Sequence, residues 1–428
     1  MKKLNIAIIG LGNIGSYLYK YLNKNKKILS KKNNCTPNII YVSARNQKKK
    51  RGLKIKKNKW LKNYLEATKI KEVDLIIELI GGAEGPAKKL VFNALKNKKH
   101  VVTANKALIA KYGDQLSKIA EKNKVNLEFE ASVCGGVPVI RSIKEGLIAN
   151  KINKIYGIFN GTSNYILSSM DKDKQDFLDV LKRAQKLGYA ESNPSTDLNG
   201  DDVSSKLKIL SSLCFNSFLN NNIHVEGIKN IDKEDIEIAN NLGYKIKLLG
   251  FAELIGESIY QRVHPTLINK NSYVGSIDGV LNAVIIEGKP IGKSTIQGEG
   301  AGPAATTSAL VSDISSILRG NIKFPFSISN KERKKLKFKN ISHRYFSAYL
   351  RFEVLDKQGI LSNITKVFSQ NKVSIKRLIQ NPNKSKGTSS IIIISHKSKD
   401  DYLRKIIRII SKKNYVIKSP KFIRIDDN

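Results

Sequence analysis

The sequence predicts an α/β protein of three domains: an N-terminal domain built on a parallel sheet, a central α+β domain and a small C-terminal domain. Three observations support this prediction. Apolar runs alternate with amphipathic segments in the first part of the chain, and this pattern changes near Lys151. The last part has the order strand, helix, strand, strand, helix, strand. Strands separated by helices are typical of βαβ units, which form parallel sheets.

The N-terminal domain, residues 1–135, has the pattern of a parallel sheet covered by helices. The lysine-rich segment Gln47–Lys59 is expected to be an exposed loop or helix. Strands are expected at Leu4–Ile9, Ile39–Ser43, Asp74–Leu79, His100–Thr103 and Asn126–Glu130, and helices at Ile14–Asn23, Pro86–Asn97 and Ala107–Lys122.

The first strand leads directly into a glycine-rich turn, GLGNIG, and then into a helix. In this context a GxGxxG motif binds a dinucleotide. Gly10 permits the tight turn, Gly12 lets a pyrophosphate approach the backbone, and Gly15 lets the helix pack closely on the strand. The pyrophosphate would lie at the helix N-terminus. We therefore expect a Rossmann-like NAD(P)-binding domain, with an ordinary glycine-rich turn as the alternative.

The end of the second strand bears on the choice between NAD and NADP. An NAD site usually has an acidic residue there, which binds the ribose hydroxyls. Here the strand is followed by Arg45 and by Lys48–Lys50. This favours NADP, whose 2′-phosphate requires a cation. NAD is the alternative, because Arg45 is one of many basic residues in the chain.

The central domain, residues 136–320, is expected to mix strands and helices. A segment rich in glycine, Gln297–Gly302, precedes a helix that is expected to return to the first sheet, near residues 303–319. Residues 321–344 are expected to form a basic linker. The expected elements are a strand at Ile152–Phe159, a turn at Asn160-Gly161, helices at Gln175–Leu187, Asp201–Cys214 and Ala304–Leu318, and strands at Ser258–Val263 and Leu281–Ile286, with Gly188 as a helix C-terminal cap.

Residues 345–428 are expected to form a ferredoxin-like domain, because the order of strands and helices is that of this fold. The expected elements are Tyr345–Val354, Ile360–Gln370, Val373–Ile379, Ser389–Ser395, Asp400–Ile410 and Tyr415–Ile425.

The composition is that of a globular protein. The 428 residues are 41% hydrophobic and 26% charged. Neither a membrane span nor a signal peptide is predicted. The widely spaced Cys35, Cys134 and Cys214 form no CxxC pair, which favours a reducing, cytoplasmic location and no structural zinc.

The net charge of +40 raises the question of a polyanionic partner. Nucleic-acid or membrane-surface binding is one interpretation. Compositional drift is the other, because the lysines form no single stripe and are not interleaved with aromatic residues. We expect neither a nucleic-acid nor a membrane partner, although a basic surface would attract a phosphate-bearing cofactor.

Acidic residues and a lysine are concentrated between Gly188 and Leu210. Carboxylates such as Glu191, Asp197 and Asp202 suit the amino group of an amino-acid substrate. A lysine such as Lys206 suits proton donation to a carbonyl if burial lowers its pKa. The alternative is an exposed Asp–Lys pair, four residues apart on a helix, which contributes little.

Two further segments follow predicted strands. Lys106 comes after Thr103 at the carboxyl edge of the sheet, where it could contact substrate or cofactor or be an ordinary helix lysine. In Glu130–Pro138, exposed carbonyls together with the Glu130 side chain could bind a hard cation through oxygen. Cys134 could be a nucleophile for an aldehyde, or simply a small buried residue.

Several motifs, in this order along nearly the whole chain, closely resemble the homoserine dehydrogenase family. They are GLGNIG, ELIGG, VTANKALIA, FEASVCGGVPVI, NGTSNYIL, GYAESNPSTDLNGDDVSSK, RVHP and GEGAGPAATTSALVSD. The resemblance implies reversible NAD(P)H-dependent reduction of L-aspartate 4-semialdehyde to L-homoserine, in threonine, methionine and isoleucine biosynthesis.

The same resemblance implies roles for individual residues. It matches Lys206 to the proton donor and Lys106 to a second active-site lysine. It matches Glu191 and Asp202, with Asp197 beside them, to substrate binding. It matches Asn13, Ile14, Thr103, Gly188 and Gly302 to cofactor contacts, and Glu130, Val133, Gly135 and Val137 to a sodium site.

The C-terminal part resembles an ACT domain. The sequence LDKQGIL, residues 355–361, leads into a helix and is followed by Val373-Ser374-Ile375. The resemblance implies feedback inhibition by threonine, with oligomerisation alone as the alternative. It also implies a monofunctional enzyme that forms a homodimer or homotetramer.

Three other functions predict different behaviour. An aldehyde dehydrogenase would depend on Cys134 as its nucleophile. A nucleic-acid-binding protein would bind duplexes with a steep salt dependence. An amino-acid sensor would have lost its catalytic site, but the acids and lysines described above are all present.

Overall fold

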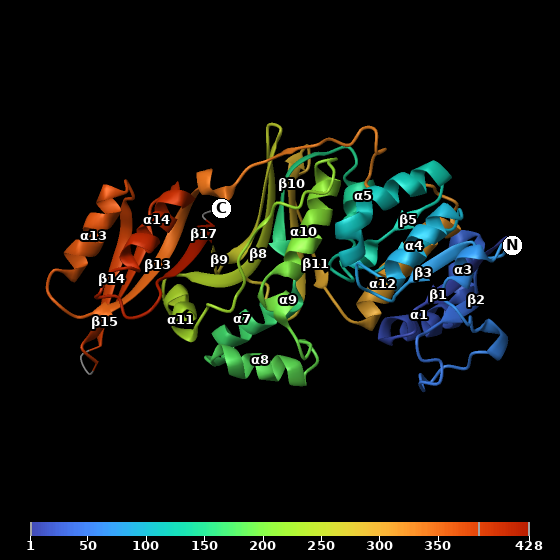
Figure 1. Cartoon of the computed structure of the whole chain (residues 1–428), viewed down its shortest axis with the longest axis horizontal. Helices are drawn as coiled ribbons and strands as arrows, with labels where there is room; N and C mark the ends of the chain where they lie inside the picture. The colour runs from blue at the N-terminus through green and yellow to red at the C-terminus, as the bar shows by residue number, and fades with distance from the viewer. Residues whose placement is uncertain (1, 384–385, 427–428) are drawn as a thin grey trace.

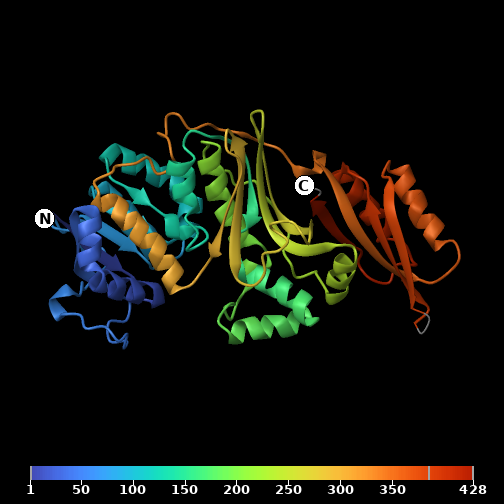
Figure 2. The same cartoon turned by 180° about the vertical axis from the view of Figure 1, so that it is seen from behind.

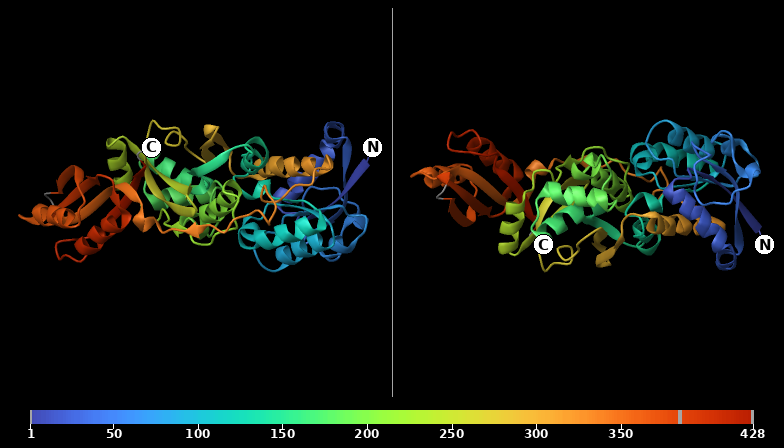
Figure 3. Two further views of the ribbon diagram at one scale, coloured as in Figure 1. Left: turned by 90° about the horizontal axis from the view of Figure 1, so that it is seen from above. Right: turned by 90° about the horizontal axis from the view of Figure 1, so that it is seen from below.

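A computed structural model describes residues 2–383 and 386–426 of the chain. Its three parts lie in a row along the long axis, with the N-terminus at one end and the C-terminal unit at the other (Figures 1 and 3). None of the helices in the described ranges is long and apolar enough to cross a membrane.

The N-terminal part is a parallel sheet with the strand order β2-β1-β3-β4-β5. This is a doubly wound arrangement, in which ligands bind at the carboxyl ends of the strands. The parallel sheet predicted from the sequence is therefore correct. Its strands are β1 (Lys2–Ile9), β2 (Cys35–Ser43), β3 (Leu75–Glu78), β4 (His100–Thr103) and β5 (Leu127–Glu128), and its helices are α1 (Asn13–Lys24), α2 (Lys26–Asn33), α3 (Glu66–Lys69), α4 (Pro86–Lys96) and α5 (Lys106–Asn123).

A helix from much later in the sequence completes this part. The helix α12 (Pro303–Leu318) lies along α1, and Figure 2 shows it in orange beside the blue helix. Its Leu310 and Ile314 are buried in one apolar cluster with Ile6 and Ile8 of β1. The chain therefore leaves the first sheet, builds the central part and returns.

The central part is a sheet whose strands β11-β10-β6-β8-β9 are antiparallel in this order, and the short strand β7 pairs with β9 in parallel. The helix α10 (Asp201–Cys214) packs against β6, β8 and β9 through a buried face that includes Val203, Leu207 and Leu210. The other elements are β6 (Lys151–Ile158), β7 (His224–Val225), β8 (Tyr244–Ile255), β9 (Ser258–Asn269), β10 (Leu281–Lys289), β11 (Gly292–Glu299), α6 (Val139–Arg141), α7 (Gly161–Asp173), α8 (Phe177–Lys186), α9 (Ser195–Leu198) and α11 (Lys233–Asn241).

One local prediction for this part is wrong. Asn160-Gly161 is not a simple turn, because Asn160 caps α7, and its side chain accepts a hydrogen bond from the Ser163 N–H at 2.7 Å. Asparagine is favoured both in turns and at helix N-termini, which explains the error.

The C-terminal unit has the predicted order of strands and helices. Its sheet runs β17-β13-β15-β14, and β17 also pairs in parallel with β9, so the central and C-terminal sheets are continuous. The final strand begins at Lys421, later than the predicted Tyr415. The elements are β13 (Tyr345–Leu355), α13 (Ile360–Gln370), β14 (Ile375–Asn383), β15 (Thr388–Ser395), β16 (Ser398–Lys399), α14 (Asp400–Ile410) and β17 (Lys421–Asp426).

The segment expected to be a basic linker is anchored to the rest of the protein. Phe326 is fully buried, and the buried Arg333 donates to the Ser217 carbonyl at 2.8 Å and pairs with Asp114 at 2.7 Å. A short strand, β12 (Lys337–Phe338), pairs with β9. The connection therefore runs over the surface in a fixed position.

Candidate functional site

The glycine-rich turn has the geometry of a phosphate cradle. Gly10 has a φ of +112°, and a Cβ on Gly15 would lie 2.0 Å from the Gly10 carbonyl oxygen. A Cβ on Gly12 would meet nothing within 4 Å, so the turn is open above that residue. No side chain caps the first turn of α1, which leaves its N–H groups at Asn13 and Ile14 available to an anion.

A cavity of about 950 Å³ lies against this turn and the ends of β2 and β3. Arg45 lines it, as the sequence suggested, but so do Lys49, Arg51 and Lys62. The Arg51 side chain donates to the carbonyl oxygens of Leu11 and Lys49, both at 2.8 Å, so it ties the basic loop to the glycine turn. Sequence reasoning missed Arg51 and Lys62, because only the fold brings them to the cavity.

Glu78, at the end of β3, organises the neighbouring strand ends. Its carboxylate accepts hydrogen bonds from the Ile80 N–H at 2.7 Å and from the Thr103 hydroxyl at 2.6 Å. Asn105 caps α5 and donates to the Gly82 carbonyl at 2.7 Å. These bonds fix one wall of the cavity relative to Lys106, the first residue of α5.

Lys106 meets residues from the central part in what we term the acid–lysine cluster: Lys106, Asn160, Asp197, Asp202 and Lys206. The two oxygens of Asp202 pair with the two lysines, at 2.8 Å for Lys206. Asn160 donates to Asp197 at 2.7 Å and to Asp202 at 2.8 Å. The Lys206 ammonium also donates to the Phe159 carbonyl at 2.6 Å. The Asp–Lys pair is thus buried, not an exposed helix pair.

The charges in this cluster stabilise one another. Burial alone would raise the pKa of Asp202, but Lys206 and Lys106 hold it below its usual value. Burial alone would lower the pKa of Lys206, but Asp202 outweighs burial and raises it. The expectation that burial lowers the pKa of this lysine is therefore wrong. Burial, reinforced by Asp202, raises the pKa of Asp197.

The remaining candidates near the cluster occupy different positions. Gly188, with a φ of +77°, ends α8, and the Tyr189 N–H bonds back to the Ala184 carbonyl at 2.9 Å. Glu191 lies on the exposed loop that follows, and its carboxylate forms no hydrogen bond or ion pair with any described residue. Gly302 has a φ of +104° and precedes α12.

The segment Glu130–Val137 is buried, contrary to the expectation of exposed carbonyls. Both carboxylate oxygens of Glu130 accept backbone N–H groups, from Ile140 at 2.9 Å and Arg141 at 2.7 Å. The carboxylate is therefore not a free cation ligand, and burial raises its pKa to about 7. Among the described residues, the carbonyl oxygens of Val133 and Gly135 accept no hydrogen bond, so oxygen donors for a small cation are present.

Cys134 lies inside the same segment and does not resemble a nucleophile. The residue is almost fully buried, and burial raises the pKa of its thiol to about 11. A thiol in that state is predominantly protonated near neutral pH and therefore reacts poorly with an aldehyde.

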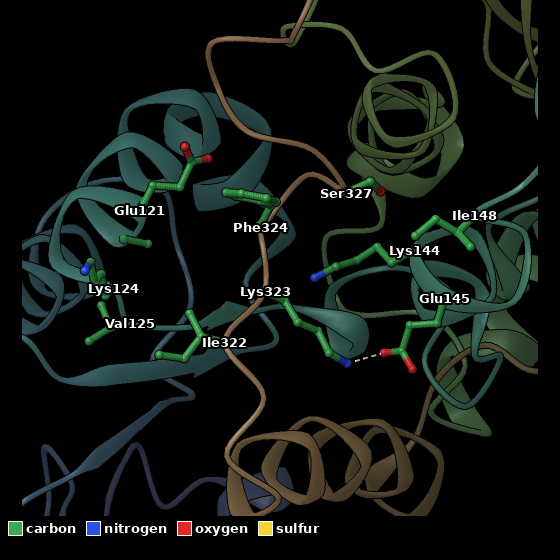
Figure 4. A pocket seen from close by; sticks show the side chains of 11 residues that line it. Glu121, Lys124, Val125, Lys144, Glu145, Ile148, Ile322, Lys323, Phe324 and Ser327 are labelled. Atoms are coloured by element: carbon green, nitrogen blue, oxygen red, sulfur yellow. Dashed lines mark hydrogen bonds and ion pairs between the residues drawn. The ribbon is translucent and has the colours of Figure 1, made fainter.

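A second cavity, of about 540 Å³, lies between the end of α5 and the anchored connection (Figure 4). Ile148, Ile322 and Phe324 supply an apolar lining, and Lys323 pairs with Glu145 across it. The predicted site residues are not among those that line it, so we assign it no role in catalysis.

Family profiles match the first two parts of the chain, and individual relatives and a solved structure match its full length. The family profile described as "Homoserine dehydrogenase, NAD binding domain" matches residues 10–130, and that described as "Homoserine dehydrogenase" matches residues 138–315. A homoserine dehydrogenase from Neisseria gonorrhoeae is 37% identical, over 100% of this chain and 99% of its own. One from Helicobacter pylori is 36% identical over 100% of both chains. A solved homoserine dehydrogenase from Thiobacillus denitrificans matches 100% of this chain and 99% of its own, with a TM-score of 0.93 and 34% identity.

Proposed function

Because this chain belongs to the homoserine dehydrogenase family, we propose that it catalyses the reversible reduction of L-aspartate 4-semialdehyde to L-homoserine by NADPH, at the acid–lysine cluster. The protein is an NAD(P)-dependent oxidoreductase that acts on a CH–OH group. The observation that carries the proposal is the buried Lys206–Asp202 pair, because it keeps a protonated amine at the meeting point of the two parts.

The proposed mechanism assigns a task to each member of the cluster. When bound, the reduced nicotinamide supplies the hydride for the aldehyde carbon. Lys206 donates its proton to the aldehyde oxygen as negative charge develops there. Asp202 keeps that amine charged, and the Phe159 carbonyl fixes its direction. The positive charge of Lys106 compensates negative charge on the substrate.

Substrate binding would involve three carboxylates. Asp197 and Asp202 are held together by Asn160, so they offer a preformed site for the substrate's amino group. Glu191 lies on an exposed loop, and we propose that it completes this site when substrate binds. The carboxylates would place the aldehyde next to Lys206.

NADP is the proposed cofactor, with NAD as the alternative. The glycine turn fits a pyrophosphate, and the adjoining cavity is lined by Arg45, Lys49 and Lys62. A cluster of cations suits a 2′-phosphate better than a bare ribose. Thr103, Gly188 and Gly302 would lie along the cofactor path.

Sodium is proposed at the buried segment, through backbone oxygens. The donors would be the carbonyl oxygens of Glu130, Val133, Gly135 and Val137. The carbonyl oxygens of Val133 and Gly135 accept no hydrogen bond from the described residues, which supports this assignment. A cation there would fix the segment that precedes α6 and so stabilise the junction between the two parts.

The C-terminal unit is proposed to be an ACT domain that senses threonine in a homodimer or homotetramer. Its sheet order, β17-β13-β15-β14, supports this proposal. The enzyme would then serve threonine, methionine and isoleucine biosynthesis in the cytoplasm.

The deciding experiment is oxidation of L-homoserine by the purified protein, followed at the nicotinamide absorbance. We expect turnover with NADP, weaker turnover with NAD, and inhibition by added threonine. No turnover with either cofactor, from protein shown to be folded, would overturn the catalytic assignment. Equal turnover with both would remove the role given to Arg45.

A further inference from the structure

A short segment after α10, residues His224–Ile228, lies between the C-terminal unit and the acid–lysine cluster; we call it the link segment. It begins as β7, which pairs with β9, and the Glu226 N–H donates to the Val263 carbonyl at 2.8 Å. One side of it faces the C-terminal unit. The other faces residues 195–202, which include α9 and the start of α10 and carry Asp197 and Asp202; we call these residues the catalytic turn.

On the side that faces the C-terminal unit, Glu226 forms ion pairs with two arginines of that unit. Its carboxylate pairs with Arg424 of β17 at 2.9 Å and with Arg404 of α14 at 2.5 Å. Both arginines also pair with the fully buried Asp400, at 2.7 and 2.6 Å. Burial alone would raise the pKa of Glu226, but the hydrogen bond from His224 and the charge of Arg424 hold it well below its usual value. These contacts therefore favour the charged form of the carboxylate.

On the second side, the link segment is in tight contact with the backbone of the catalytic turn. A Cβ on Gly227 would lie 2.1 Å from the Leu198 carbonyl oxygen, which also accepts the Ile228 N–H at 2.9 Å. A Cβ on Gly200, at the start of α10, would lie 3.1 Å from the Val225 side chain. Leu198 directly follows Asp197, and Gly200 precedes Asp202 by two residues.

We infer that Glu226 is a positioning residue for the substrate-binding acids, through which the C-terminal unit controls substrate affinity. A movement of α14 or β17 relative to β9 displaces the Glu226 carboxylate through its ion pairs with Arg404 and Arg424. Gly227 and Ile228 transmit this movement to Leu198, because no space separates the two backbones. Asp197 and Asp202 then shift relative to Asn160 and Lys206. The cofactor cavity lies on the first sheet and does not touch the link segment. The inference rests on the proposed function of these acids.

The structure offers a matched control in Asp235. This buried carboxylate, on α11, also joins the C-terminal unit, through Arg351 at 2.9 Å and the Tyr349 hydroxyl at 3.1 Å. Its helix packs mainly against β8 and α7. Glu226→Gln and Asp235→Asn both convert an ion-paired carboxylate at this junction into an amide, half-buried in Glu226 and fully buried in Asp235, but only Glu226 belongs to the link segment.

The test compares steady-state kinetics of the full-length variants with L-homoserine and NADP. For Glu226→Gln we expect the KM for homoserine to rise about tenfold, which corresponds to about 1.4 kcal/mol. The KM for NADP should change less than twofold. Asp235→Asn should keep both constants within twofold of the parent. A Glu226→Gln variant with an unchanged homoserine KM, or with both KM values raised equally, overturns the inference.

A second measurement does not depend on turnover. Amide hydrogen exchange in residues 195–202 should accelerate in Glu226→Gln and stay at the parent rate in Asp235→Asn. If Glu226→Gln does not fold, Arg404→Gln removes one of its two arginine partners and should give the same pattern at smaller amplitude. Exchange that is unchanged in both Glu226→Gln and Arg404→Gln overturns the inference even if the parent proves inactive. An inactive parent with the expected exchange pattern overturns only the proposed reaction.

Discussion

At the scale of single residues, the charge of Lys206 results from two opposing effects. Burial disfavours the ammonium form, and the adjacent Asp202 favours it. Asp202 prevails because it lies 2.8 Å from the ammonium and is itself held charged by both lysines. Lys206 is therefore protonated before substrate binds, and Asp202 determines the pH at which Lys206 loses its proton.

Lys206→Ala should lower kcat for aldehyde reduction by about 10²–10⁴-fold, since that is the usual contribution of a positioned proton donor. The KM for NADP should change little. Lys208→Ala, two residues along the same helix, is the matched control and should retain activity, because Lys208 pairs with Asn221 and not with the cluster. Normal turnover in Lys206→Ala would contradict the mechanism.

Asp202→Asn should change the pH profile of the reduction. Reduction requires protonated Lys206, so in the parent the rate falls only as pH rises through a pKa above the usual lysine value. Without the carboxylate, burial becomes the main effect and lowers that pKa, so the falling limb should move to lower pH. A pH–rate series of kcat measures this shift, and an unmoved limb would disprove the pairing.

At the scale of elements, the sequence predicted best where pattern and caps agree. The bounds of α10, α13 and α14 match the prediction, and at α10 and α13 a preceding glycine coincides with the start of the apolar periodicity. The helix α7 was not predicted, because Asn160-Gly161 at its start has the composition of a turn. The cluster itself could be only partly predicted: Asp202 and Lys206 share a helix, but only folding brings Lys106 and Asn160 to them.

Gly15→Ala should separate α1 from β1, because the new Cβ would lie 2.0 Å from the Gly10 carbonyl oxygen. We expect a loss of about 1–3 kcal/mol in the free energy of unfolding and a raised KM for NADP. Urea unfolding and cofactor titration measure the two effects. Gly146→Ala is the control, since its Cβ would meet nothing within 4 Å. Equal stability of the two variants would contradict the predicted clash.

At the scale of the whole molecule, the central and C-terminal parts share one sheet. The pairing of β17 with β9 joins them through the backbone, and two buried ion-pair groups, around Arg424 and Arg351, join them through side chains. Because both kinds of contact must break together, we expect the two parts to unfold as one unit.

Arg424→Met should weaken this junction strongly. It leaves the buried carboxylate of Asp400 and the half-buried carboxylate of Glu226 with fewer partners. Removal of one member of a buried ion pair typically costs about 3–5 kcal/mol. Arg408→Met, at an exposed position on α14, is the control and should be nearly neutral. Differential scanning calorimetry should show a lower Tm for Arg424→Met only. Equal melting temperatures would mean that the backbone pairing alone holds the parts together.

The order of segments along the chain has a consequence for biosynthesis. The helix that completes the first sheet, α12, follows the whole central part in sequence, and β17, which joins the two later sheets, follows every other described strand. During synthesis, the strands of each sheet therefore leave the ribosome before the element that completes the sheet, α12 or β17. Until then, apolar Ile6 and Ile8 lack their cover and the edge of β9 has an incomplete set of strand partners, so the nascent chain would present surfaces that chaperones recognise.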